Sequence, residues 1–138
     1  MLNKLNHIAL ILDGNKRWAK KNKLSYINGY TKGFENIKNL ATYSLSRQVA
    51  NLTIFALSSE NFNRSSINLI YELIYNNFSK TFSDLISNKE VRVKIFGSRK
   101  NLPKKILEIF NNIETKSLDN NKLNLNIAFN YGFKDEIK

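Results

Sequence analysis

Cysteine is absent from the 138-residue sequence, and histidine occurs only once, at His7. Without cysteine the chain has no disulfides and no thiolate metal sites. A histidine-based metal cluster or a Ser-His-Asp triad would have to use His7, and no partner for either lies near it in the sequence. These absences exclude most metal-thiolate and nucleophilic hydrolase chemistry.

Long hydrophobic runs are also missing. The longest uninterrupted apolar run, Ile8–Leu12, is far shorter than the roughly 18 residues that a membrane-spanning helix needs. Residues 1–6 lack the apolar stretch of a secretion signal. We therefore expect a cytoplasmic protein, with peripheral contact to a membrane surface left open.

Acidic residues are scarce: 11 Asp and Glu against 22 Lys and Arg give a formal net charge of +11. Such an excess favours an anionic partner, which is nucleic acid, a phosphorylated ligand or an anionic membrane surface. The alternative is compositional drift, because the chain is rich in Asn, Lys and Ile and only five of its basic residues are Arg. No nucleic-acid-binding motif is present, so we expect no nucleic-acid partner.

The composition is that of a folded chain, with 42% apolar and 12% aromatic residues, and its length predicts a single domain over residues 1–138. Four segments predict strands: His7–Leu12, Leu52–Leu57, Val91–Phe96 and Leu123–Phe129. The first two are nearly continuous apolar runs, typical of buried parallel strands. The last two alternate, which is typical of half-exposed or edge strands.

Helical periodicity lies between these strands. It covers Gly33–Arg47, Asn68–Ile86 and a segment that Pro103 opens, and a further helix is expected near Phe133. Strands and helices thus alternate along the chain. This order predicts an α/β fold, an open and mostly parallel sheet with flanking helices.

Polar residues follow the first predicted strand, where ligands of open α/β sheets bind. They are Asp13, Gly14, Asn15, Lys16, Arg17 and Trp18. Gly14 allows a close backbone approach, a helix that starts at Asn15 or Lys16 favours an anion, and an arginine adds a bidentate contact. A lone carboxylate beside a phosphate is typical of Mg²⁺, which binds one or two carboxylates plus substrate phosphates. The alternative is a capped helix with solvated basic side chains.

A second polar loop follows the second predicted strand. It consists of Ser58, Ser59, Glu60, Asn61, Phe62, Asn63 and Arg64. Ser58 and Asn61 have groups that hydrogen-bond a diphosphate or a reacting group, and Arg64 has a group that pairs with phosphate. The alternative is an ordinary turn in which Ser65 or Ser66 caps the next helix.

Four segments in succession, "HIALILDGNKRWA", "ALSSENFNR", "VRVKIFG" and "LNLNIAFNYG", resemble the signatures of the cis-prenyltransferase family, best known from undecaprenyl diphosphate synthases. The resemblance covers His7 to Ile137. It implies an enzyme that condenses isopentenyl diphosphate onto an allylic diphosphate, usually farnesyl diphosphate, to give a long-chain cis-polyprenyl (undecaprenyl) diphosphate. It also implies Mg²⁺ as cofactor and a homodimer or a partner subunit.

The resemblance assigns roles residue by residue. Asp13 would be catalytic and hold Mg²⁺, and Asn61 would sit where the proton is removed. The residues implied to bind substrate are Gly14, Asn15, Lys16, Arg17, Trp18, Ser58, Ser59, Glu60, Phe62 and Arg64, with Trp18 along the allylic chain. The helix Asn68–Ile86, with Tyr71, Tyr75 and Phe78, is a candidate wall of an apolar product channel; ordinary core packing is the alternative.

Several positions depart from the family's pattern. Lys16 stands where the family usually has glycine, and Tyr26 and Tyr30 stand where it usually has arginine and histidine. The family's sequence also continues past Lys138, with residues for isopentenyl diphosphate. We therefore expect a C-terminally incomplete domain, truncated after the fourth strand. Two hypotheses stay open: an active synthase, or a weak or inactive member that binds isoprenoid diphosphate or supports a partner subunit.

Overall fold

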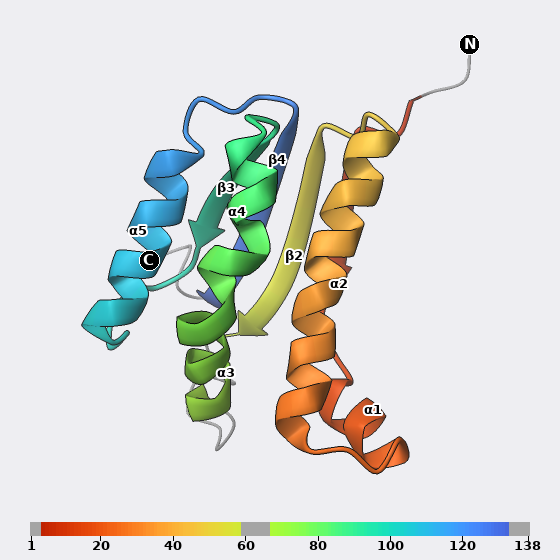
Figure 1. Ribbon diagram of the computed structural model, residues 1–138, viewed down its shortest axis with the longest axis vertical. Coiled ribbons are helices and arrows are strands. Elements are labelled where there is room, and N and C mark those ends of the chain that lie inside the picture. The colour runs from red at the N-terminus through yellow and green to blue at the C-terminus, as the bar shows by residue number, and fades with distance from the viewer. Residues whose placement is uncertain (1–3, 59–66, 133–138) are drawn as a thin grey trace.

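The computed structural model describes residues 4–58 and 67–132 (Figure 1). Strands and helices alternate in the order β1 (His7–Ile11), α1 (Asn15–Lys21), α2 (Tyr26–Ser46), β2 (Asn51–Ser58), α3 (Ile67–Leu73), the π-helix η2 (Ile74–Phe78), α4 (Ser79–Ser87), β3 (Val91–Phe96), α5 (Lys104–Lys116) and β4 (Leu123–Tyr131). The predicted α/β fold is confirmed. Within the described ranges, no helix is both long and apolar enough to span a membrane.

Two helices differ in detail from the sequence prediction. The helix expected from Gly33 begins earlier, at Tyr26, directly after Ser25 in extended conformation. Glycine has low helix propensity, so Gly29 and Gly33 obscured these first turns. The second helix is continuous along its predicted length, but its middle widens into the π-turn η2, a feature that apolar periodicity does not reveal.

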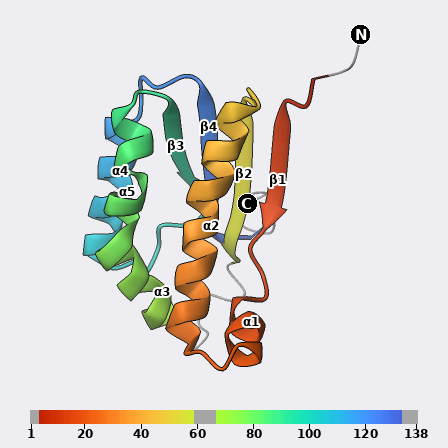
Figure 2. The same ribbon diagram turned by 45° about the vertical axis from the view of Figure 1, so that its right-hand side comes forward.

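The sheet has the order β1-β2-β4-β3, and all of its pairs are parallel. Leu10, Ile54, Ile127 and Ile95 stand in register across it. Figures 1 and 2 show α2, α3 and α4 in front of the sheet, with α5 beside β3. The strand residues of this row therefore face the helices, and Ile54 is completely buried there.

Helix α5 protects the outer edge of β3. The backbone N–H of Val93 donates to Ser117 Oγ at 2.9 Å, and that of Ile95 donates to Glu114 Oε2 at 3.4 Å. Arg99 pairs with Glu114 and donates to the Ile95 carbonyl oxygen at 3.4 Å. These contacts satisfy backbone groups that an edge strand would leave open. The alternating burial of β3 confirms its predicted half-exposed, edge character.

The fourth strand was predicted to be half exposed or nearer an edge, and the edge position is wrong. β4 lies between β2 and β3 and is largely buried. Its polar alternation has another cause: Asn124 Nδ2 donates to Asn51 Oδ1 at 3.1 Å, and Asn126 Nδ2 donates to Thr53 Oγ1 at 3.3 Å. Asn124 and Asn126 are only partly buried and lie on the open face of the sheet, so the polar alternation follows the two faces of an interior strand.

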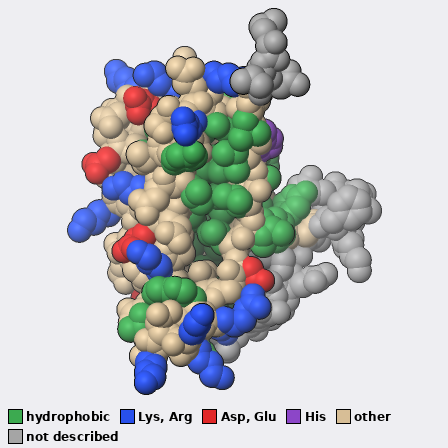
Figure 3. Space-filling model, turned by 90° about the vertical axis from the view of Figure 1, so that its right-hand side faces the viewer, with side chains coloured by type: hydrophobic (Ala, Val, Ile, Leu, Met, Phe, Trp, Pro, Cys, Tyr) green, Lys and Arg blue, Asp and Glu red, His purple; other side chains and the backbone are tan. Residues whose placement is uncertain are grey.

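The first strand was predicted to be buried, and this too is wrong. β1 forms the other edge of the sheet, and most of its residues are exposed, including Leu10 and Ile11, the latter with 75% of its surface accessible. Figure 3 faces this side of the molecule and shows hydrophobic side chains gathered over it. An apolar run reports composition and not strand order, so it did not distinguish an edge from an interior strand.

We expect this apolar edge to cause self-association of the 138-residue chain. Unpaired backbone groups on an apolar strand are a template for pairing with another strand, and a lysine at the edge opposes it. Sedimentation velocity should show concentration-dependent association that Ile11→Lys reduces. Leu118→Lys is the control, because Leu118 is similarly exposed but follows α5. Equal reduction by both substitutions would rule out the β1 edge as the cause.

Candidate active site at the carboxyl ends of the strands

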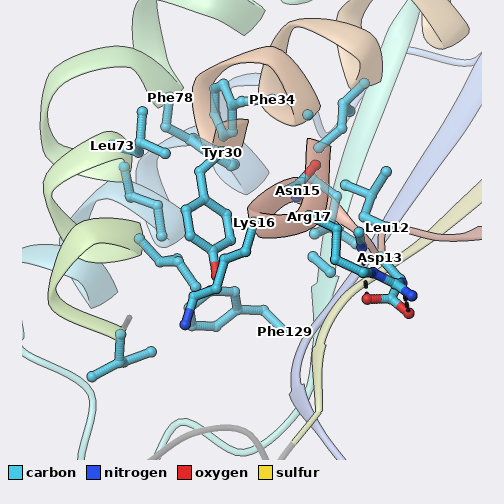
Figure 4. Close-up of a pocket in the computed structure, with 18 of the residues that line it drawn as sticks. Leu12, Asp13, Asn15, Lys16, Arg17, Tyr30, Phe34, Leu73, Phe78 and Phe129 are labelled. Carbon is cyan, nitrogen blue, oxygen red and sulfur yellow. Dashed lines mark hydrogen bonds and ion pairs between the residues drawn. The ribbon is translucent and has the colours of Figure 1, made fainter. Parts of the chain in front are cut away.

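A cavity of about 320 Å³ opens beside the carboxyl end of β1 and extends between α2 and α3 (Figure 4). The residues at its mouth are polar or glycine, and we call Asp13–Arg17 the mouth segment. The deeper lining is apolar: Leu12, Phe34, Ile37, Ala56, Ile67, Ile70, Leu73, Ile74, Phe78, Phe110, Ile127 and Phe129, with Tyr30 and Gly33 from α2. The cavity therefore joins a polar entrance to a hydrocarbon interior.

The chain turns sharply between the end of β1 and the start of α1. Gly14 has φ +87°, a left-handed conformation that favours glycine. The Gly14 N–H donates to Asp13 Oδ1 at 2.7 Å, and α1 begins at the next residue. The glycine is thus explained by the turn itself, and a close approach to ligand stays a prediction.

Asp13 and Arg17 face one another across the first turn of α1. Arg17 Nη2 lies 3.3 Å from Asp13 Oδ2, and their side chains are 80% and 78% exposed, respectively. An ion pair this exposed contributes little stability because water screens it. Both groups are therefore free to exchange this contact for a ligand at low cost.

The mouth segment rests on α2 through two glycines one turn apart. A Cβ added at Gly29 would lie 2.3 Å from the carbonyl oxygen of Asn15, and one at Gly33 would lie 2.7 Å from Asn15 Oδ1. Only a residue without a side chain permits this approach. The sequence analysis missed both residues, although isolated glycines inside a helical pattern are a signal for close packing.

Basic charge dominates the entrance. Lys16 and Arg17 line the cavity together with a single carboxylate, Asp13, among the described residues. Lys16 Nζ lies 5.3 Å from the centre of the Tyr26 ring, a cation–π geometry. Tyr30 lines the cavity, whereas Tyr26 is half exposed outside the lining. This balance of charge favours an anion at the mouth.

Of the helix predicted as a channel wall, α3 and η2 line the cavity and α4 does not, and a use of the cavity as a product channel stays a prediction. Of Tyr71, Tyr75 and Phe78, only Phe78 lines the cavity. Tyr75 instead lies under Lys105 of α5, with Nζ 4.7 Å from the ring centre. Burial raises the pKa of Tyr71, and the nearby Tyr75 adds to this rise, so Tyr71 stays neutral near pH 7. Aliphatic side chains of α3 and η2 form the wall.

The other predicted site residues are placed less completely. Trp18 is 40% exposed on α1 and lies outside the described lining, so its contact with an allylic chain stays a prediction. Ser58 ends β2 and pairs with Tyr131. The remaining residues of the second loop, Ser59, Glu60, Asn61, Phe62, Asn63 and Arg64, lie outside the described residues.

The oxygen ligands that the mouth segment offers fit a metal ion whose other ligands come from a substrate. Within residues 4–58 and 67–132, no group of three or more histidine, aspartate or glutamate side chains gathers to hold a metal. Mg²⁺ needs only one or two carboxylates when substrate phosphates supply further oxygens. Asp13, exposed at the entrance, meets that requirement.

A second basic hollow lies on the sheet face opposite the helices. It is about 230 Å³ in volume and is lined by Asn51, Arg92, Lys94, Phe96, Asn124 and Asn126. It is a shallow depression on the open sheet and leads to no apolar interior. It therefore offers an anion a surface contact without a place for a hydrocarbon tail.

An open parallel α/β sheet, with a basic mouth that leads into an apolar cavity, defines a class of protein suited to an anion with a hydrocarbon tail. The comparisons name the family. The sequence profile described as "Putative undecaprenyl diphosphate synthase" matches residues 11–138, and the chain belongs to this cis-prenyltransferase family.

Related sequences carry the same kind of name. The chain is 38% identical over 135 residues to the tritrans,polycis-undecaprenyl-diphosphate synthase (geranylgeranyl-diphosphate specific) of Pyrobaculum aerophilum, covering 95% of this chain and 57% of that protein. It is 36% identical over 133 residues to the isoprenyl transferase of Thermotoga maritima, with the same coverage. The chain thus spans little more than half the length of these relatives.

Solved structures agree on the fold. Lavandulyl diphosphate synthase from Lavandula x intermedia, in complex with dimethylallyl diphosphate, superposes with a TM-score of 0.91 at 26% identity, covering 97% of this chain and 58% of that one. A probable undecaprenyl diphosphate synthase from Campylobacter jejuni gives a TM-score of 0.73 at 29% identity, covering 99% and 59%. The predicted cis-prenyltransferase fold is confirmed.

We expect Gly29→Ala to destabilise the chain by about 1–3 kcal/mol, the range for overpacking a close contact. The added methyl would meet the Asn15 carbonyl oxygen at 2.3 Å. At an ordinary helix position the same change stabilises by roughly 1 kcal/mol, so the sign is diagnostic. Urea unfolding measures it, with Asn28→Ala, at an exposed neighbouring position, as control. A Gly29→Ala chain as stable as wild type would refute the close contact.

Proposed function

We propose that this chain forms the allylic-diphosphate site of an isoprenyl transferase that condenses isopentenyl diphosphate onto an allylic diphosphate. The observation that carries the proposal is the continuity between the basic mouth segment and the apolar cavity. An allylic diphosphate has the same two parts, a dianionic or trianionic head and a branched hydrocarbon tail. Family membership supports the reaction class.

Farnesyl diphosphate is the proposed acceptor, and a long-chain cis-polyprenyl diphosphate such as undecaprenyl diphosphate is the proposed product of the whole protein. Two findings support this part: the family description and the names of the relatives. One relative is named as specific for geranylgeranyl diphosphate, so acceptor length varies among these proteins.

Loss of the diphosphate from the allylic carbon is the step that needs help from charge. Arg17 would leave Asp13 and pair with the diphosphate, and Lys16 would turn from the Tyr26 ring toward the same group. Asp13 would hold Mg²⁺, which, when bound, neutralises the leaving group. The apolar walls exclude water from the allylic carbon, which limits hydrolysis.

A second candidate function is isoprenoid binding without turnover, as a weak or inactive member or as support for a partner subunit. It is favoured by Tyr26 and Tyr30, which supply no positive charge where the resemblance implies arginine and histidine. Incorporation of labelled isopentenyl diphosphate into longer products by the 138-residue chain would decide for the transferase and against the second candidate.

We expect Asp13→Asn to remove most of the Mg²⁺ dependence of binding. Calorimetry with the unreactive farnesyl thiolodiphosphate should show an affinity at least about tenfold weaker in Mg²⁺, equal to about 1.4 kcal/mol. The fold should be unchanged in circular dichroism, because the side chain is 78% exposed.

Glu35→Gln is the matched control for this experiment. Glu35 is an exposed acid 3.7 Å from Lys32 Nζ on α2, outside the cavity lining. Its substitution should leave the Mg²⁺ dependence of binding intact. An Asp13→Asn chain that binds as wild type does in Mg²⁺ would remove the proposed metal role.

A further inference from the structure

Exposed hydrophobic side chains gather around α1, at the end of the molecule where Figures 1 and 2 place this helix. Among the described residues nine large hydrophobic side chains are exposed, and three of them, Trp18, Leu24 and Tyr26, lie within residues 18–26. An exposed apolar patch rimmed by polar residues marks a site of interaction with a protein or a membrane. The surroundings of these three side chains therefore indicate what they contact.

The same segment is strongly basic. Residues 14–34 contain six basic residues and no acidic residue. Lys20, Lys21 and Lys23 are exposed, and none of these three side chains forms an ion pair with another described residue. Figure 3 shows Lys and Arg side chains around hydrophobic ones at the lower end of the molecule, where α1 lies. We call the following residues the α1 surface: Trp18, Lys20, Lys21, Lys23, Leu24 and Tyr26.

The fold holds the α1 surface outward. Ala19 is completely buried and is the only buried residue of α1. A Cβ added at Gly29 would lie 3.0 Å from Ala19 Cβ, so the inward side of α1 rests directly on α2. The Leu24 N–H donates to the Ala19 carbonyl oxygen at 2.9 Å and fixes the chain after the helix. The exposed side chains are thus presented from a braced backbone.

Helix stability accounts for only part of this pattern. Lys20 and Lys21 lie in the last turn of α1, where positive charge complements the helix dipole. Lys23 lies beyond the helix, in left-handed conformation with φ 57°, so this explanation does not cover it. The dipole also gives no reason for an exposed tryptophan and an exposed leucine. A surface that binds a ligand accounts for the basic and the apolar residues together.

An anionic phospholipid bilayer matches both parts of the α1 surface. Tryptophan and tyrosine favour the interface between lipid and water, and the boundary of headgroups and acyl chains accommodates a leucine. Lysine stems lie along apolar surface while their ammonium groups reach anionic headgroups. Nucleic acid offers phosphates and stacking bases but no aliphatic environment for Leu24, so it fits less well.

We propose that the α1 surface docks onto an anionic phospholipid bilayer. Lys16 and Arg17 belong to α1 and also line the cavity, so docking brings the mouth of the cavity next to the lipid. The docking does not depend on the proposed function, but its consequence rests on it. The hydrocarbon tail of an isoprenoid diphosphate would pass between bilayer and cavity without crossing water.

Trp18 reports on this docking because it is the only tryptophan in the chain. Vesicles of phosphatidylglycerol and phosphatidylcholine, without isoprenoid, should shift its emission to shorter wavelength, and lipids brominated near the headgroup should quench it. Salt should weaken the binding, since it screens charge at an exposed surface. Unchanged emission, or equal binding to pure phosphatidylcholine vesicles, would overturn the proposal. A shift with duplex DNA and none with vesicles would assign the surface to nucleic acid instead.

Lys20→Gln combined with Lys21→Gln should weaken vesicle binding by at least about tenfold, because each lysine near an anionic bilayer contributes about fivefold. Cosedimentation with the vesicles measures this, and circular dichroism checks the fold. Arg92→Gln combined with Lys94→Gln is the matched control, because it removes the same charge from the open face of the sheet. Equal losses in the two double variants would overturn the assignment to the α1 surface.

Leu24→Ser tests the apolar part and should weaken vesicle binding by at least about threefold. Leu118→Ser is its control, since Leu118 is also exposed but follows α5. Losses of the same size in both would overturn insertion of Leu24. Calorimetry with farnesyl thiolodiphosphate in the absence of vesicles separates the docking from the proposed function. Vesicle binding without ligand binding would remove the proposed function and keep the docking, and the reverse result would remove the docking alone.

Discussion

The approach of Asn15 to the bare backbone of α2 fixes the position of every charged group at the mouth of the cavity. Gly29 and Gly33 have no side chains, so the first turn of α1 lies directly against the helix. Asp13 and Arg17 flank Asn15 in sequence and are bonded to one another. If α1 moved away from α2, the carboxylate and the guanidinium would move with it.

The same helix carries the other end of the site. Beyond the two glycines, α2 supplies Phe34 and Ile37 to the deep part of the cavity. One helix therefore borders both the charged mouth segment and the apolar interior of the cavity.

Much of the fold and of the mouth segment was predictable from the sequence, and the predictions that were wrong have physical causes. The place of Asp13–Arg17 followed from a general rule, that ligands meet the carboxyl ends of parallel strands. The edge position of β1 and the interior position of β4 did not follow, because strand order is decided by tertiary packing and by cross-strand amide bonds such as Asn124 to Asn51. A glycine inside a helical pattern signals close packing at Gly29, but the partner, a backbone atom of another helix, does not follow from that local pattern.

The most direct test of a single site that binds head and tail together is an amide NMR titration of the chain with geranyl thiolodiphosphate and Mg²⁺. The structure predicts that resonances of the mouth segment and of α2 from Tyr30 to Ile37 shift together, at one affinity, while Arg92 and Lys94 in the hollow on the opposite face of the sheet do not change. Shifts confined to Arg92, Lys94 and their neighbours, or to the mouth segment without the α2 residues, would contradict it.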